Sequence, residues 1–347
     1  MKLIYSDDHR AHAGAKEMRY DQMIPMSESP ERMDMIMAAL AEAGFADVVP
    51  PEPHGFDIVH QVHDPAFVSF LERCYPLWEA EFGPGGFATA YTFGMRGMDQ
   101  VPNQSVHSML SCYTFDVCVP FVAGTWHAIN SAKDAALTGV DLMQQGENAV
   151  FSLCRPPGHH ASGDMAGGYC YLNNAAIAAQ AHLNNGAKRV AILDIDYHHG
   201  NGTQAIFYDR ADVFYASLHC RPEDEYPFLM GYGTEVGRDA GKGYNLNLPM
   251  PRGTDFSVWG PAMDLALARI AAYAPDVLVI SLGVDSFAGD PVGGFELQSE
   301  DYTTIGRTLA KAGLPTQFIM EGGYAMEALG RNVANVISGY TQGCAGR

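Results

Sequence analysis

The sequence of 347 residues has no apolar run that approaches the roughly 20 residues needed to cross a bilayer. Its first eight residues end in Asp7 and Asp8, two acids where a signal peptide would have its apolar segment. These absences predict a protein with no membrane partner and a cytoplasmic location.

Basic residues are scarce. There are 21 Lys and Arg against 40 Asp and Glu, which gives a formal net charge of −19, and no stretch is rich in Lys or Arg. A field of this sign repels phosphate backbones and attracts cations, so it argues against a nucleic-acid partner and favours a small cationic substrate. Adaptation to a saline host would favour the same bias, and that alternative stays open.

The seven cysteines are scattered and form no Cys-x-x-Cys pair. An odd number without such spacing fits free thiols in a reducing compartment, and it argues against a thiol nucleophile or a cysteine-rich zinc site. The glycines of residues 82–87 lack the Gly-Lys-Ser/Thr of a phosphate-binding loop. The sequence therefore offers no nucleotide-binding signature.

Short apolar runs alternate with stretches of helical periodicity along most of the chain. Runs typical of buried parallel strands occur at residues 2–5, 149–153, 190–193, 213–218, 277–281 and 317–320. Helices are predicted over residues 29–44, from 64 onward, and over 124–145, 173–185, 203–208, 257–273, 301–312 and 327–339. This alternation predicts an α/β fold in a single domain over residues 1–347, with an open, mostly parallel sheet and helices on both faces.

Residues 75–123 interrupt the alternation. They contain several aromatic residues and a glycine-rich segment but little periodicity. A long irregular insert in a compact domain is usually a functional loop or a contact between subunits. We therefore expect this segment to shape specificity or to form a dimer interface.

Polar residues follow four of the predicted strands. They are Arg-Pro-Pro-Gly-His-His at 155–160, the segment 194–202, Gly-Val-Asp at 283–285 and Glu-Gly-Gly-Tyr at 321–324. Ligands of open parallel sheets bind at the carboxyl ends of the strands. The sequence therefore predicts an active site where these four segments meet.

Three of these residues have the character of metal ligands. Asp196 and His198 are two apart, so they point to the same side of an extended chain, and Asp285 follows another strand. Three ligands would leave a position open for water and substrate on a catalytic Zn²⁺, while two carboxylates also keep Fe²⁺ or Co²⁺ open. The alternative is that the acids cap helices and the histidine packs in the core.

The tandem His159 and His160 follow a stiff Pro-Pro-Gly turn. Imidazole is suited to general acid and base catalysis because its pKa lies near working pH. Tyr324 follows two glycines and could donate its phenol to a developing oxyanion. The alternatives are a pair of buried structural histidines and an ordinary Gly-Gly-Tyr turn.

Several strings together resemble the zinc-dependent histone deacetylase superfamily. They are Arg-Pro-Pro-Gly-His-His, Gly-Gly-Tyr-Cys-Tyr-Leu-Asn-Asn, Asp-Ile-Asp-Tyr-His-His-Gly-Asn-Gly-Thr, Ser-Leu-Gly-Val-Asp and Glu-Gly-Gly-Tyr, in family order over most of the chain. Ser6, His9, Glu17, residues 124–126 and the long insert resemble the bacterial acetylpolyamine amidohydrolases within it. The resemblance implies the arginase/deacetylase fold and a Zn²⁺ enzyme that hydrolyses N-acetyl amides.

The resemblance also implies roles for the strand-end residues. The predicted metal ligands match the zinc ligands, the tandem histidines match the catalytic pair, and Tyr324 matches the catalytic tyrosine. Asp194 matches the carboxylate that orients His159, and Asn201 stands at the position that matches the carboxylate partner of the second histidine. An amide stabilises an imidazolium less than a carboxylate does. We therefore expect His160 to be a neutral base that later acts as acid, and His159 to be cationic.

Two potassium sites are implied in the same way. The first combines the side chains of Asp194 and Ser217 with backbone oxygens of Asp196, His198 and Leu218. The second comprises Phe207, Arg210, Val213 and Tyr244.

The substrate contacts implied by the resemblance are Glu17, Asp116, Tyr169 and Tyr226. The two tyrosines match the aromatic walls of the channel, and Glu17 matches an acid at its mouth. Where the family has further acids in the insert, this chain has His107 and Cys118, which predicts shorter diamines or a relaxed choice. The acidic run 223–225 either attracts a cation at the rim or is a solvated loop.

Together these features predict deacetylation of N-acetylated polyamines or diamines to free amine and acetate, by a homodimer formed through residues 75–123. A protein lysine deacetylase of broad specificity is the alternative, since it would use the same chemistry behind an open rim. An arginase-like two-metal ureohydrolase needs more ligands than residues 199–201 supply. A metal-binding protein without catalysis would have no use for His160 and Tyr324.

Overall fold

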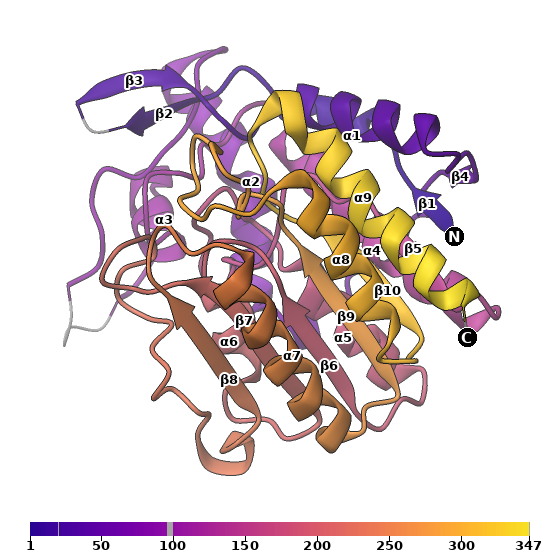
Figure 1. Cartoon of the computed structure of the whole chain (residues 1–347). Helices are drawn as coiled ribbons and strands as arrows, with labels where there is room; N and C mark the ends of the chain where they lie inside the picture. Colours follow the sequence, from indigo (N-terminus) through magenta and orange to yellow (C-terminus); the bar gives the residue numbers. More distant parts are fainter. Residues whose placement is uncertain (20, 96–99, 347) are drawn as a thin grey trace.

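The computed structural model describes residues 1–19, 21–95 and 100–346, and a sheet of eight strands lies at its centre (Figure 1). In sheet order the strands are β4 (Val48–Val49), β1 (Lys2–Ile4), β5 (Ala149–Ser152), β10 (Thr316–Met320), β9 (Val277–Leu282), β6 (Val190–Asp194), β7 (Val213–Cys220) and β8 (Asn245–Met250). All neighbouring pairs in this sheet are parallel. A separate antiparallel hairpin comprises β2 (Lys16–Arg19) and β3 (Gln22–Pro25).

Helices cover both faces of the sheet. One face packs against α1 (Glu31–Glu42), α7 (Phe256–Tyr273), α8 (Ser299–Ala310) and α9 (Met326–Ala345), which lie in front of the sheet in Figure 1. The other face packs against α2 (Pro65–Phe82), α3 (Val106–Tyr113), α4 (Thr125–Gln144), α5 (Asn174–Asn184) and α6 (Asn201–Phe207). The fold is therefore a helix–sheet–helix sandwich, as the alternation of the sequence predicts.

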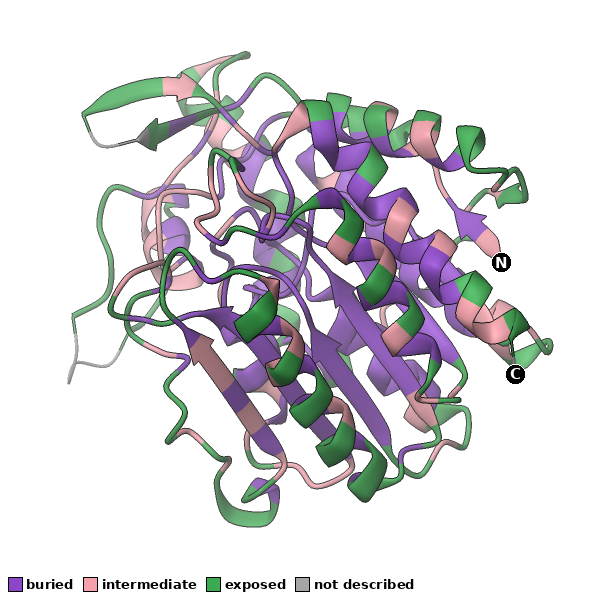
Figure 2. Cartoon of the chain, viewed as in Figure 1, coloured by how far each residue is buried: buried purple, intermediate pink, exposed green. Residues whose placement is uncertain are grey.

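The two cores follow from the alternation of side chains along the strands. In β6, Ala191 and Leu193 point to the face of α7 and α8, whereas Val190 and Ile192 point to the face of α4 and α5. Strands β10, β6 and β7 are buried along their whole length, and β9 is buried except at Val277 (mostly purple in Figure 2), which is why they read as continuous apolar runs.

The structure differs from the sequence prediction mainly in the insert and at the sheet edge. Residues 75–123 are not irregular throughout, because α2 continues through Pro76 to Phe82 and α3 lies within the insert. The edge strand β8 was not predicted, since its two asparagines and Pro249 mask the apolar alternation. The short β4 and the β2–β3 hairpin were also missed. Assignment of the whole chain to one domain stays a prediction.

The hydropathy of the helices tests whether any of them could span a membrane. Among the described residues, no helix is long and apolar enough to cross a bilayer. The cytoplasmic location stays a prediction.

A buried cluster of three charges links the N-terminal segment to the sheet. The Glu28 carboxylate accepts hydrogen bonds from Arg32 Nη1 at 2.9 Å and from Arg155 Nε at 2.8 Å, and all three side chains are fully buried. Arg155 also donates to the backbone oxygens of His9 and His12. The strand-end segment after β5 is thereby tied to the first turn of the chain.

Arg32 extends this connection to the strand end of β10. Its Nε donates to the backbone oxygen of Gly323 at 2.7 Å, and its Nη2 donates to that of Glu321 at 2.6 Å. One acid on the N-terminal side therefore holds two arginines that fix the loops after β5 and β10.

We expect Glu28→Gln to lower the free energy of unfolding by about 3 kcal/mol or more, because it leaves two buried guanidinium groups without a counter-charge. Urea unfolding would measure the difference. Asp209→Asn is a matched control, since Asp209 lies 3.6 Å from Arg238 at the surface, and we expect it to change stability by less than about 1 kcal/mol. Equal, small effects of both variants would contradict this role of Glu28.

Candidate active site

The loops after β5, β10, β9 and β6 meet at one edge of the sheet because these four strands are neighbours in the sheet. A cavity of about 400 Å³ opens there, and residues from all four loops line it, among them His160, Tyr324, Val292 and His198. This size is in the range of small-molecule sites. The site lies at the carboxyl ends of the strands, as the sequence predicts.

The structure brings the three predicted metal ligands together beside the cavity, and His198 lines it. His198 Nδ1 lies 3.0 Å from Asp285 Oδ2 and 3.3 Å from Asp196 Oδ1. Their ligand atoms all lie within 4.8 Å of one another, and all three residues are buried. The segment carrying Asp196 and His198 is a loop rather than a strand, so hydrogen bonds instead of strand alternation set their directions.

The charge of this group favours a bound cation. Burial and the neighbouring Asp196 carboxylate raise the pKa of Asp285 to about 7. Backbone N–H groups of Tyr197 and Gly322 donate to Asp285 Oδ1 and Asp196 Oδ2, each at 2.8 Å, and so orient the carboxylates. Two buried carboxylates and one imidazole form a donor set suited to a divalent cation such as Zn²⁺.

Two glycines make room for these carboxylates. A Cβ atom at position 283 would overlap Asp196 Oδ2, and one at position 322 would lie 2.5 Å from both Asp196 Oδ2 and Asp285 Oδ2. Neither Gly283 nor Gly322 has a positive φ angle, so close approach rather than backbone conformation requires glycine here. The shape of this cradle fits a metal centre formed by the three side chains.

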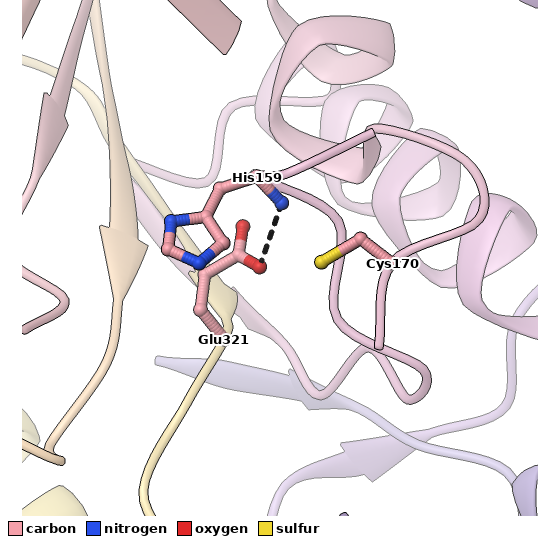
Figure 3. Close-up of side chains that lie close together, drawn as sticks. All are labelled: His159, Cys170 and Glu321. Carbon is pink, nitrogen blue, oxygen red and sulfur yellow. Dashed lines mark hydrogen bonds between the residues drawn. The ribbon is translucent and has the colours of Figure 1, made fainter. Parts of the chain in front are cut away.

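A second group of metal-ligating residue types comprises His159, Cys170 and Glu321 (Figure 3). Two of its side-chain atoms have partners, whereas Glu321 Oε1 accepts no hydrogen bond from the described residues. Glu321 Oε2 accepts from the backbone N–H of His159 at 3.2 Å, and Cys170 Sγ donates to the backbone oxygen of Gly168 at 3.3 Å. Burial raises the pKa of Cys170 well above its usual range, which disfavours the thiolate that a metal needs. This group therefore anchors the loop and is a poor metal site.

The tandem histidines have different partners. His159 Nδ1 lies 3.1 Å from Asp194 Oδ2, whereas His160 Nδ1 lies 2.7 Å from Asn201 Oδ1. The turn before them packs closely against the start of α5, since a Cβ at Gly158 would lie 2.5 Å from the backbone nitrogen of Asn174. Both rings are buried and line the cavity.

These partners set opposite protonation preferences. Burial alone would lower the pKa of His159, but the carboxylates of Asp196 and Asp194 outweigh it and raise that pKa to about 10. Burial lowers the pKa of His160 well below its usual range, and the positive charge of His159 lowers it further. The two pKa shifts therefore have the directions expected if His159 is cationic and His160 is neutral.

Tyr324 is held by residues that the sequence analysis did not single out. Asp290 Oδ2 accepts from the backbone N–H groups of Tyr324 at 2.7 Å and Ala325 at 2.9 Å. The Arg32 guanidinium lies 4.8 Å from the centre of the Tyr324 ring. In the sequence, the one feature that could have indicated Asp290 is its position five residues after Asp285. No feature near Arg32 in the sequence indicates its contact with Tyr324.

The predicted wall residues Tyr169 and Tyr226 both line the cavity. Each hydroxyl donates to a carboxylate: Tyr169 to Glu17 Oε2, and Tyr226 to Asp116 Oδ2 at 2.7 Å. Asp116 also accepts from the backbone N–H groups of Gly168 and Cys118, each at 2.8 Å. Both acids that the sequence analysis assigned to the substrate therefore lie behind the wall tyrosines.

The residues of the first predicted potassium site lie beside the metal group. Those of the second lie around the start of β7. Asp194 and Ser217 are partners in the β6–β7 register, and both are fully buried. The backbone N–H of Arg210 donates to the oxygen of Phe207 at 3.0 Å, and that of Tyr215 donates to the oxygen of Tyr244 at 2.9 Å. Val213 pairs with Val190 at the start of β7.

The fold and the site together match one family. Residues 26–340 match the histone deacetylase domain, and the chain belongs to this family. The open eight-stranded sheet is accordingly the arginase/deacetylase fold.

Among its relatives the chain is 48% identical over 343 residues to acetylpolyamine amidohydrolase 1 of Pseudomonas aeruginosa, covering 98% of this chain and 99% of the relative. It is 47% identical over 339 residues to the acetylpolyamine amidohydrolase of Mycoplana ramosa, with coverage of 98% and 99%. The crystal structure of acetylpolyamine aminohydrolase from Burkholderia pseudomallei superposes with a TM-score of 0.93 at 36% identity, covering 99% of both chains.

We expect Gly283→Ala to weaken Zn²⁺ binding about 10-fold or more, because the added Cβ displaces the Asp196 carboxylate. Competition with a zinc chelator would measure the affinity. Gly55→Ala is the matched control, since a Cβ there meets no atom within 4 Å. An unchanged zinc affinity of a folded Gly283→Ala protein would remove Asp196 from the metal centre.

Proposed function

We propose that the protein is a zinc-dependent amidohydrolase that deacetylates N-acetylated polyamines or diamines to free amine and acetate. The observation that carries this proposal is a buried Asp–His–Asp group whose histidine lines the same cavity as the histidine pair and the tyrosine. The family is zinc-dependent, and the relatives that match over nearly the full length are named acetylpolyamine amidohydrolases. An amide-hydrolysing reaction is the chemistry that these observations share.

Zn²⁺ held by Asp196, His198 and Asp285 would polarise the acetyl carbonyl and lower the pKa of the attacking water. The side chains around it manage the protons. His160, kept neutral by burial beside Asn201, accepts a proton from the water and later donates it to the nitrogen of the departing amine. Water adds its oxygen to the acetyl carbon as the C–N bond breaks, so the products are acetate and an ammonium.

His159 has a different role in this proposal. Held by Asp194 and kept cationic, it supplies positive charge next to the reacting carbonyl without exchanging a proton. Tyr324 donates its phenol hydrogen to the oxyanion that develops on the carbonyl oxygen. Burial raises the pKa of Tyr324 well above its usual range, so the phenol keeps this hydrogen at working pH.

The test of this function is a comparison of substrates with zinc-loaded enzyme. We expect acetylputrescine, acetylcadaverine and acetylspermidine to release amine much faster than an acetyl-lysine peptide, because the wall tyrosines and their acids narrow the cavity. Rates of acetate release, the product that all four substrates share, would decide. Comparable or faster rates on the peptide would favour the protein lysine deacetylase instead.

Substitution of Tyr324 by Phe tests the oxyanion role. We expect turnover to fall about 100-fold or more, with little change in zinc content, because one hydrogen-bond donor to the oxyanion is lost. Single-turnover kinetics on acetylputrescine would measure the chemical step. Near-normal turnover in this variant would remove Tyr324 from the mechanism.

We also propose that potassium occupies the two sites described above and has a structural role. What supports the first site is that the fully buried Asp194 lies opposite the fully buried Ser217 in the β6–β7 register. Potassium would offset this buried negative charge. A thermal midpoint that is identical in potassium and in a large organic cation would argue against both sites.

Finally, we propose that the protein forms a homodimer through residues 75–123. The support is a group of large apolar side chains exposed by 46% to 79% in this insert: Phe82, Tyr91, Phe93, Met95 and Val101. Exposed apolar groups of this size often mark contacts between proteins. We expect sedimentation equilibrium at micromolar concentration to give a dimer mass, and a monomer mass would contradict the proposal.

A further inference from the structure

One acid and one base stand at the mouth of the cavity. Glu225 and Arg252 both line it, and the Glu225 carboxylate is paired with the Arg252 guanidinium. Glu225 Oε2 also accepts from the Tyr197 hydroxyl at 3.1 Å, and Oε1 accepts from the backbone N–H of Tyr226 at 3.1 Å. This acid is therefore fixed in place, with its side chain 14% exposed.

The net charge of the cavity mouth differs from that of the whole molecule. Among the described residues that line the cavity, Glu225 is the sole acid and Arg252 the sole Arg or Lys. Glu17 and Asp116 are absent from this lining and accept hydrogen bonds from the wall tyrosines. The tail of a substrate, meaning its end farthest from the acetyl amide, therefore meets a pair of opposite charges that is neutral overall. The whole chain, in contrast, carries a net charge of −19.

Arg252 retains hydrogen-bonding capacity at this mouth. Its side chain is 56% exposed, and within the described part of the chain only its Nη2 has a recorded side-chain partner. The stem lies against Gly294, where an added Cβ would come within 3.0 Å of Arg252 Cγ and 3.2 Å of Cζ. The guanidinium is thus located by contact with the cavity wall while most of its five donors remain for a ligand.

This pairing disfavours a tail that carries an ammonium alone. Such a cation reaches Glu225 only by competing with a guanidinium of the same charge. A tail that carries a carboxylate beside its ammonium replaces the ion pair between Glu225 and Arg252 with two new ion pairs. The carboxylate binds Arg252, and the ammonium binds Glu225. Arg is suited to this because its planar fork matches a carboxylate.

We propose that the cavity mouth recognises a zwitterionic tail, so that ω-N-acetylated α-amino acids such as free Nε-acetyl-lysine are substrates alongside acetylated diamines. The inference rests on the proposed function, because the same catalytic groups cleave the acetyl amide. It adds Glu225 and Arg252 as residues that determine specificity.

Two substrates that differ by one group provide the test. Free Nε-acetyl-L-lysine is acetylcadaverine with a carboxylate on the carbon that carries the amine. We expect the wild-type enzyme to hydrolyse both, and we expect Arg252→Gln to lower the ratio of kcat/KM for acetyl-lysine to that for acetylcadaverine about 10-fold or more. The change should lie in KM, with acetylcadaverine gaining because the competing cation is gone.

Arg238→Gln is the matched control, since Arg238 is an arginine whose side chain is 66% exposed and which pairs with Asp209 and Asp239 outside the cavity. In Arg238→Gln the ratio of kcat/KM for acetyl-lysine to that for acetylcadaverine should equal that of the wild type. Acetyl-lysine capped at both its amine and its carboxylate lacks the zwitterion, and we expect Arg252→Gln to leave its KM unaltered. Thermal midpoints of all variants would show that they fold.

The outcomes separate the two proposals. An unchanged substrate ratio in Arg252→Gln, or a wild-type enzyme that cleaves acetylcadaverine but not acetyl-lysine, would overturn the zwitterion inference and leave the proposed function intact. A zinc-loaded wild-type enzyme that cleaves none of the acetylated amines would overturn the proposed function itself.

Discussion

Buried negative charge at one edge of the sheet is the constraint on which the rest of the structure depends. Asp194, Asp196, Asp285 and Glu321 are all fully buried at neighbouring strand ends. Carboxylates are kept in such a place only by hydrogen bonds and positive charge. Here backbone N–H groups of the strand-end loops donate to the carboxylates and His159 lies beside Asp194, and the proposed metal ion would supply further positive charge. The catalytic arrangement and the electrostatic balance of the core are therefore the same set of contacts.

The loops that carry the site are held from behind by fixed charges. Arg155, in the segment after β5, and Arg32 share Glu28, and Arg32 also donates to the backbone after β10. Asp290 holds the backbone at Tyr324. These contacts use buried, charge-assisted hydrogen bonds, which are stronger and more directional than neutral ones. A tyrosine on a glycine-rich loop is thereby held in a defined position beside the metal group, which catalysis by preorganised donors requires.

Specificity is divided between the walls and the mouth of the cavity. Glu17 and Asp116 accept hydrogen bonds from the hydroxyls of the wall tyrosines, whereas the proposed contact for the far end of the substrate is the ion pair of Glu225 and Arg252. An overall acidic surface can attract a cationic amine from a distance. The neutral mouth then discriminates between tails by the arrangement of their charges, because contact distances make local charges dominate.

The sequence by itself determined the parallel sheet and the place of the site, because buried strands read as apolar runs and strand ends of such sheets converge. Asp196, His198 and Asp285 were predictable on that ground, and their neighbours His159 and Tyr324 followed. Only the tertiary structure decided the partners of the remaining charges. Glu17 meets Tyr169 across 152 positions of the chain, and Asp116 meets Tyr226 across 110. Such pairs depend on how irregular loops pack, and no local periodicity encodes that.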